Sequence, residues 1–178
     1  MCGIVGVVEG RGFAVPRAQV EAAVAAIRYR GPDNQAYWSE DSVTFGHLRL
    51  SIVDLSPAGH QPMFSADERY VITYNGEIYN HNELRAELDA EAAHNWRGSS
   101  DTEVLLELIS RRGVEAALKK VDGMFAFALW DAQEQALYLC RDRFGEKPLY
   151  YSLGAGAAAR PPLSLPVHLI FASEIKAL

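Results

Sequence analysis

The first residue of this chain that could do chemistry is Cys2, which directly follows the initiator methionine. If Met1 is removed, Cys2 carries a thiol and a free α-amine on one residue. The unperturbed pKa of a thiol is about 8.5 and that of an α-amine is about 7.7–8.0, so near neutral pH the amine can accept the thiol proton. Cys2 is therefore a candidate nucleophile that needs no histidine. The alternative is a small hydrophobic residue on a frayed terminus.

Arg49 lies in a run, residues 47–52, in which polar and apolar residues alternate. Its guanidinium presents paired donors that match the two oxygens of a carboxylate, so it is a candidate for binding a carboxylate in a cleft. The same position in the alternation is typical of a residue on the solvent face of a strand. Taken alone, the pattern favours the solvent face.

Asn75 and Gly76 follow a strand-like run, and this dipeptide is typical of a hairpin turn. The other interpretation is an oxyanion hole, in which the Asn75 amide and the Gly76 backbone N–H donate to a developing alkoxide. One such donor typically contributes about 3–4 kcal/mol to the transition state. Glycine would also let a substrate approach the backbone closely. Taken alone, the dipeptide favours the turn.

Asp101 opens a predicted helix, where an acidic side chain gains a few tenths of a kcal/mol or more from the helix dipole. That gain is enough to explain it, although a carboxylate there could instead bind a cationic ligand group. The five histidines include no pair with ligand spacing on a predicted element, so we expect no metal site. The run Gly145-Glu146-Lys147 lacks the other residues of a phosphate-binding loop.

The amino-acid composition and net charge indicate the general class of protein. The 178 residues are 49% hydrophobic and 22% charged, which is typical of a globular domain. The net charge is −6 and there is no basic tract, so nucleic acid is not an expected partner. Cys2 and Cys140 are the only cysteines, and no apolar run is long enough to span a membrane. These observations predict a cytoplasmic protein without a membrane partner.

Hydrophobic patterns predict strands and helices along the chain. Strands are expected at residues 2–8, 43–50, 69–74, 123–130, 136–141, 149–153 and 168–172. Helices are expected at residues 16–27, 83–88 and 102–111, the last with a capping box between Ser100 and Glu103. Residues 30–34 are expected to form a loop. Strands near both ends with short polar turns favour an α+β fold with antiparallel sheets.

Eight ordered motifs cover nearly the whole chain, and together they are more specific than any one of them. They are CGIVG (2–6), RGPD (30–33), RLSIVD (49–54), YNGEIYN (74–80), SDTE (100–103), GMFAFA (123–128), RDRFGEKPLYY (141–151) and FASEIKAL (171–178). In order and content they resemble the glutaminase domain of glutamine-hydrolysing asparagine synthetases, which are class II glutamine amidotransferases.

The resemblance implies a fold and a set of roles. The fold would be the four-layer α-β-β-α sandwich of N-terminal nucleophile hydrolases. Cys2, with its own α-amine as general base, would attack the side-chain amide of glutamine, and a glutamyl thioester would then be hydrolysed. The resemblance assigns the other roles as follows: the oxyanion to Asn75 and Gly76, the substrate carboxylate to Arg49, the α-ammonium to Asp101 and Glu77, and backbone contacts to Ile52 and Val53.

The resemblance also implies what these residues lack. Residues 1–178 would be one glutaminase domain, and the ATP-dependent synthetase domain that follows it in the family would be absent. No cofactor is therefore expected here, with ATP and Mg²⁺ belonging to the synthetase domain. The expected partners are glutamine and that domain, and a homodimer stays open. Residues 152–167 are longer than the expected turn and are predicted to be a surface insertion.

Two alternatives remain at this stage. One is the glutaminase domain of another amidotransferase that supplies ammonia to a different acceptor. The other is a non-enzymatic interaction module that keeps the fold and carries an idle thiol. The apolar run 124–129 is expected to be packed sheet core, although it could also line a path for ammonia.

Overall fold

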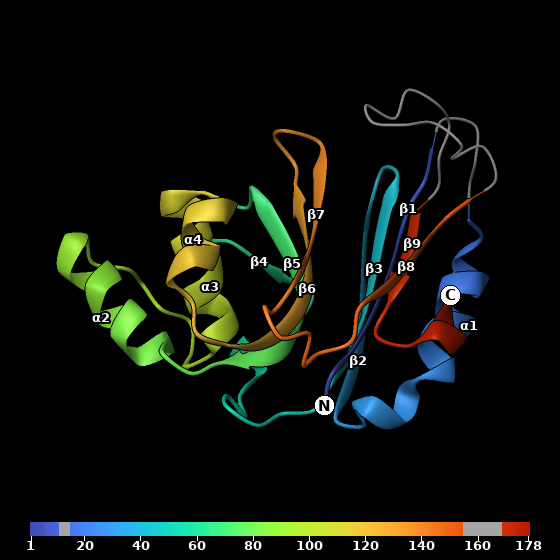
Figure 1. The fold of residues 1–178 in the computed structure, drawn as a ribbon, viewed down its shortest axis with the longest axis horizontal. Coiled ribbons are helices and arrows are strands. Elements are labelled where there is room, and N and C mark those ends of the chain that lie inside the picture. The colour runs from blue at the N-terminus through green and yellow to red at the C-terminus, as the bar shows by residue number, and fades with distance from the viewer. Residues whose placement is uncertain (11–14, 155–168) are drawn as a thin grey trace. The chain divides into compact units, whose positions relative to one another are not determined.

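The structure is a computed structural model that describes residues 1–10, 15–154 and 169–178. These residues form two compact units, the first from residues 1–50 and 148–178 and the second from residues 51–147. Each unit contains one antiparallel sheet and its own helical elements (Figure 1). The α+β class with antiparallel sheets is confirmed. Among the described residues, no helix has the length and apolar character needed to cross a membrane.

The first unit holds a five-stranded sheet in the order β2-β3-β1-β9-β8. Its strands are β1 (Gly3–Val8), β2 (Asn34–Glu40), β3 (Val43–Arg49), β8 (Tyr150–Leu153) and β9 (Leu169–Ala172). Its helical elements are α1 (Arg17–Ala26), η1 (Arg28–Arg30) and η3 (Ile175–Ala177), of which the last two are 3₁₀ turns. The strand β1 from the start of the chain thus pairs with β9 from its end.

One face of this sheet packs against α1. Val24 and Ile27 are fully buried and lie in one cluster with Val5 and Leu48 of the sheet. A strand alternates its side chains between two faces, so Cys2, Ile4 and the other even-numbered residues of the first strand belong to the opposite face. The residues expected to do chemistry at the start of the chain therefore lie on the sheet face away from α1.

The second unit holds a four-stranded sheet in the order β4-β5-β6-β7 (Figure 1). Its strands are β4 (Met63–Phe64), β5 (Tyr70–Ile78), β6 (Gly123–Asp131) and β7 (Ala136–Arg141). Its helical elements are η2 (Pro57–Gly59), α2 (His81–Glu91), α3 (Asp101–Arg112) and α4 (Val114–Lys120). The central pair, β5 and β6, is in register from Tyr70 opposite Asp131 to Ile78 opposite Gly123.

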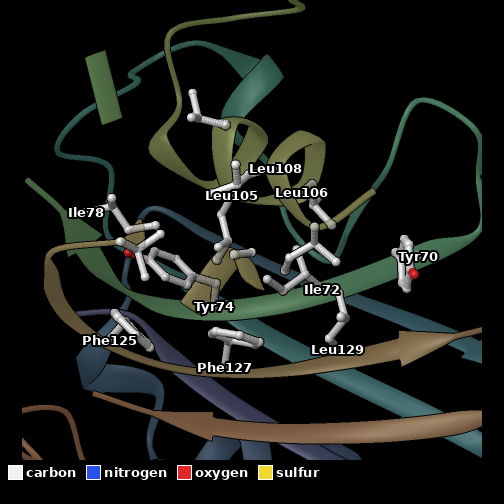
Figure 2. Close-up of a cluster of buried hydrophobic side chains, with 14 of the residues drawn as sticks. Tyr70, Ile72, Tyr74, Ile78, Leu105, Leu106, Leu108, Phe125, Phe127 and Leu129 are labelled. Atoms are coloured by element: carbon white, nitrogen blue, oxygen red, sulfur yellow. The ribbon is translucent and has the colours of Figure 1, made fainter. Parts of the chain in front are cut away.

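The core of the second unit lies between this sheet and α3. Figure 2 shows Tyr74 and Phe127 on neighbouring strands below Leu105 of the helix. The first nine residues of α3 are buried except Glu107, which explains why this helix is apolar on more than one side. Phe125, Phe127 and Leu129 of β6 belong to the same cluster, so the expectation that the run 124–129 is packed core is confirmed for these side chains.

Several sequence predictions need correction. Asn75 and Gly76 do not form a hairpin turn, because they lie inside the nine-residue strand β5 and pair with Ala126 and Phe125. The expected loop at 30–34 is confirmed for residues 31–33, while Arg30 ends the turn η1 and Asn34 begins β2; α4 was not predicted at all. Of the predicted insertion at 152–167, residues 152 and 153 belong to β8, and residues 155–167 lie outside the described residues.

The capping box at the start of α3 is half correct. Ser100 Oγ accepts from the backbone N–H of Thr102, as a helix N-cap should. Glu103, however, accepts from the backbone N–H groups of Arg97 and Gly98, at 2.9 and 3.1 Å, and from the Arg97 side chain. Glu103 therefore fixes the turn that precedes the helix, which is the turn that leads to Asp101.

Candidate active site

Cys2 lies one residue before β1 and is half-buried. The backbone N–H of Leu50 points at its sulfur, with the nitrogen 3.4 Å from Sγ, and the Leu50 carbonyl oxygen is 3.6 Å from the same sulfur. The sulfur therefore contacts both the N–H and the carbonyl of one residue, which together fix where it lies.

Arg49 belongs to the same part of the first unit. The antiparallel register pairs Gly3 with Leu48 and Ile4 with His47, and its continuation places Cys2 opposite Arg49. Arg49 is only 6% exposed, so the interpretation that it is a solvent-face residue is wrong. Cys2 and Arg49 therefore lie next to the same end of the β1–β3 ladder, in one part of the first unit.

Asn75 lies at the middle of β5 in the second unit, with the small residue Ala126 opposite it on β6. The side chain is 1% exposed, and its Nδ2 has no hydrogen-bond partner among the described residues. A buried donor without a partner costs about 1–3 kcal/mol. Such a cost is expected at a site where the donor is reserved for a ligand.

Gly76 is required by the backbone of the neighbouring strand. A Cβ atom at this position would lie 2.4 Å from the carbonyl oxygen of Met124 and 2.7 Å from Cα of Phe125. No side chain fits at that distance, so the residue must be glycine whether or not a substrate approaches. From the sequence, the glycine was attributed to a hairpin turn or, in the alternative interpretation, to substrate access; the close approach of β6 is a separate and sufficient reason.

Asp101 opens α3 and contacts β5 at two points. Its Oδ2 accepts from the Tyr74 hydroxyl at 3.0 Å and from the backbone N–H of Ile78 at 2.9 Å, while Oδ1 accepts from Thr102 N–H. The carboxylate is 4% exposed, and burial raises its pKa even though these hydrogen bonds act to lower it. A carboxylate has about four acceptor positions, so at least one remains for a further donor.

The remaining candidates also lie in the second unit. Glu77 follows Gly76 in β5 and is half-buried. Ile52 and Val53 lie in a loop and are 68% and 36% exposed, which is unusual for large apolar side chains. The exposed backbone and side chains of this loop are free to meet a ligand.

Asp54 is a residue whose role the sequence argument did not anticipate. Its Oδ1 accepts from Ser56 N–H at 2.7 Å, and its Oδ2 accepts from Ser99 N–H at 2.8 Å. It thereby joins the loop of Ile52 and Val53 to the turn that leads into Asp101. A Cβ on Gly98 would lie 2.3 Å from Asp54 Oδ2, which shows how close the two segments are.

The candidates therefore fall into two groups, one in each unit. Cys2 and Arg49 come together in the first unit, and in the second unit Asp54 and Asp101 connect the other candidates. Leu50 and Asp54 were missed as contributors, although both lie inside the RLSIVD motif. In the part of the chain that the structure describes, no three His, Cys, Asp or Glu side chains gather to hold a metal ion.

Comparisons with known proteins give a consistent result. A family model for the glutamine amidotransferase domain matches residues 1–178. Asparagine synthetase (glutamine-hydrolyzing) 1 of Bacillus subtilis is 42% identical over 100% of this chain, and asparagine synthetase (glutamine-hydrolyzing) 2 of the same organism is 39% identical over 100%. The chain spans only 26% and 22% of their lengths, or about a quarter of these relatives.

A solved structure is similar over almost all of the chain. It is the glutamine phosphoribosylpyrophosphate amidotransferase of B. subtilis in complex with ADP and GMP, with a TM-score of 0.78. The likeness covers 99% of this chain and 42% of that one at 20% sequence identity. At this identity the likeness shows the fold alone, and the predicted fold class is confirmed.

Proposed function

Since this chain belongs to the glutamine amidotransferase domain family, we propose that it hydrolyses the side-chain amide of glutamine to glutamate and ammonia, with Cys2 as the nucleophile. The observation that best supports the proposal is the buried amide of Asn75, whose Nδ2 has no partner among the described residues. A donor kept unpaired inside a protein is what a developing oxyanion requires.

The reaction begins at the first unit. Removal of Met1, which is 53% exposed, leaves the α-amine on Cys2. That amine, directly or through a water, accepts the thiol proton while the sulfur attacks the amide carbon. The N–H of Leu50 faces the sulfur and stabilises its negative charge before the attack. The proton then passes to the leaving nitrogen, the C–N bond breaks, and ammonia departs.

The resemblance assigns the stabilisation of the oxyanion to two residues of the second unit. The Asn75 amide and the Gly76 backbone N–H donate to the oxygen that becomes negative in the tetrahedral intermediate. Water then hydrolyses the glutamyl thioester, which releases glutamate and restores the thiol. Each donor contributes about 3–4 kcal/mol in systems where one has been removed.

The charged ends of glutamine need charges of opposite sign. Arg49, buried and on the sheet face of Cys2, pairs with the α-carboxylate through its paired donors. Asp101 uses its remaining acceptor position for the α-ammonium, with Glu77 as the second acid. Backbone groups of Ile52 and Val53 complete the contacts from the exposed loop.

The released ammonia would serve asparagine synthesis. The relatives that the chain matches at 39–42% identity are named as asparagine synthetases, and the chain spans about a quarter of each. We therefore propose that residues 1–178 act as one glutaminase domain whose partner is an ATP-dependent synthetase domain. ATP and Mg²⁺ would be bound by that domain.

The proposal is tested by intact mass of the 178-residue chain before and after reaction with 6-diazo-5-oxo-norleucine. This glutamine analogue alkylates a thiol that attacks its diazomethyl carbon, with N₂ as the leaving group. Loss of Met1 and one adduct mapped to Cys2 are expected, with free glutamine protecting the thiol. A chain without Met1 that gives no adduct and releases no glutamate from glutamine would instead be an interaction module with an idle thiol.

A further inference from the structure

Strand pairing brings the chain as far as Gly3 but does not hold Cys2 itself. The ladder between β1 and β3 begins at Gly3, and the ladder between β1 and β9 begins at Val5. Cys2 lies outside both. A nucleophile must be held to well below 1 Å, since a misplacement of about 1 Å can cost about 100-fold in rate. Other contacts must therefore hold this residue.

Arg30 supplies one such contact. Its Nε donates to the carbonyl oxygen of Cys2 at 2.9 Å, and its Nη1 pairs with Oε1 of Glu174 at 2.9 Å. The Arg30 side chain is 7% exposed and the Glu174 side chain is 22% exposed. One guanidinium thus connects the nucleophilic residue to a carboxylate near the other end of the sequence.

Glu174 is itself held on several sides. The Tyr29 hydroxyl donates to both of its carboxylate oxygens, and Lys176 Nζ lies 3.5 Å from Oε2. Hydrogen bonds from Tyr29 and Arg30 keep the pKa of Glu174 below its usual range. The carboxylate therefore stays charged at neutral pH, and its orientation toward Arg30 is fixed.

Ser173, the residue before Glu174, holds Ile4 of β1. Ser173 Oγ accepts from the backbone N–H of Ile4 at 3.0 Å, and Ser173 N–H donates to the Ile4 carbonyl at 2.9 Å. Ser173 is fully buried. Two consecutive residues therefore fix Ile4 directly and Cys2 through Arg30.

We propose that Ser173 and Glu174 are positioning residues for the nucleophile: together they hold the start of β1 so that the Cys2 sulfur stays at the Leu50 N–H. The inference rests on the proposed role of Cys2. It assigns a purpose to the FASEIKAL motif, which the proposed mechanism otherwise leaves unused. The competing explanation is an ion pair that only contributes to stability.

The test compares three single variants of the 178-residue chain with the unsubstituted chain, and adds Arg30→Lys alone and combined with Glu174→Gln. Glu174→Gln removes the charge, and Glu174→Asp keeps the charge but shortens the side chain by one methylene. Glu21→Gln is the matched control, because Glu21 forms an exposed pair with Arg17 in the same unit. Each chain is reacted with 6-diazo-5-oxo-norleucine over a range of concentrations and separately with iodoacetamide, and the Cys2 adduct is quantified by peptide mass.

For a positioning role, both Glu174 variants should lower the maximal rate of Cys2 modification by about tenfold, while the half-saturating concentration changes by at most about twofold. Glu174→Asp should lower this rate with little change in melting temperature. A slower reaction at unchanged melting temperature distinguishes a positioning role from a role in stability alone. The Glu21 control should match the unsubstituted chain. Combining Glu174→Gln with Arg30→Lys should slow Cys2 no further than Arg30→Lys alone, because both act through one contact.

Two results would overturn the inference. One is Cys2 modification in both Glu174 variants within about twofold of the unsubstituted rate for both reagents. The other is a half-saturating concentration that rises as much as the rate falls, which would mean a damaged substrate pocket. If the diazo compound fails on every chain but iodoacetamide still reacts more slowly with both Glu174 variants, the proposed function fails and the positioning role stands.

Discussion

The proposed nucleophile and the proposed oxyanion donors are held in different ways. Asn75 and Gly76 lie inside a nine-residue strand whose ladder with β6 extends on both sides of them. Cys2 lies beyond the end of its ladder and depends on individual contacts: the Arg30 side chain contacts its carbonyl, and the backbone N–H of Leu50 contacts its sulfur. The first arrangement is set by many backbone hydrogen bonds, and the second by a few specific ones.

This difference predicts which substitutions should displace Asn75 and which should displace Cys2. A residue inside a ladder keeps its backbone position when its side chain is changed, so substitution of Asn75 should remove a donor and move little else. A residue at a chain end can be displaced by changes elsewhere, so the position of Cys2 should respond to residues far away in sequence. The four predictions that follow test this contrast, from the largest expected effect to the smallest.

Cys2→Ala should remove the reaction itself. Without a nucleophile, glutamine hydrolysis should fall by at least roughly 10⁴-fold, to the level of uncatalysed background. The matched control is Cys140→Ala, since burial raises the pKa of the Cys140 thiol to about 12 and leaves it unreactive. The measurement is glutamate release together with adduct formation. Retained turnover in Cys2→Ala would place the chemistry at another residue.

Asn75→Ala should lower turnover by roughly 100-fold or more while glutamine binding changes little, because the lost donor acts mainly in the transition state. The matched control is Asn82→Ala, an exposed asparagine on α2 of the same unit. Steady-state kinetics of glutamate release separate kcat from KM. If the loss appeared mainly in KM, Asn75 would be a substrate-binding residue and the oxyanion would be held elsewhere.

Asp54→Asn should weaken glutamine binding. An amide in place of the carboxylate cannot accept from both Ser56 and Ser99, so the exposed loop of Ile52 and Val53 loses its tie to the turn before α3. We expect KM to rise roughly 3- to 10-fold with a smaller change in kcat. Asp67→Asn is the control, because Asp67 lies in the turn between β4 and β5 of the same unit, where its Oδ1 accepts from the Ser65 hydroxyl and from the Arg69 backbone N–H. Equal effects in both variants would assign Asp54 a stabilising role only.

Local sequence patterns predicted most of the secondary structure and the identity of the candidates. The helix at residues 101–112 and most strands have clear signals, because apolar periodicity reports local geometry. The turn assigned to Asn75 and Gly76 was wrong because pairing with β6 overrides the preference of a dipeptide. The burial of Arg49 was also missed, since a two-residue alternation does not say which face of the strand is covered.

Contacts between distant residues explain what sequence reasoning could not find. Asp54 meets Ser99 45 positions away, and Arg30 meets Glu174 144 positions away. A backbone donor such as Leu50 N–H carries no side-chain signature at all. The motifs therefore indicated which segments matter, while the fold was needed to say which residue of a motif contacts which.

Lowering the pH should reduce the stability of the second unit through Asp142. Its carboxylate accepts hydrogen bonds from backbone N–H groups. Burial acts to raise the pKa of Asp142, but hydrogen bonds from backbone N–H groups, those of Lys147 and Glu146 foremost, outweigh it and lower the pKa. A lowered pKa in the folded state stabilises the protein above the unfolded value of 3.8, and this contribution is lost as pH falls through the folded value.

Asp142→Asn should therefore lower the free energy of unfolding by roughly 1–3 kcal/mol at about pH 7 and by less at about pH 3, because the contribution of the charged carboxylate is lost progressively below the unfolded value of 3.8. Urea unfolding at both pH values measures this, with Asp122→Asn as a control at an exposed position. If the two chains lost equal stability on acidification, the Asp142 contacts would not depend on its charge. A smaller loss in the variant would show that the charge of Asp142 strengthens its hydrogen bonds to the backbone of the 142–147 turn. The Asp142 side chain would then hold a backbone segment as the Arg30 side chain holds the backbone of Cys2, and both arrangements contrast with the backbone ladder around Asn75.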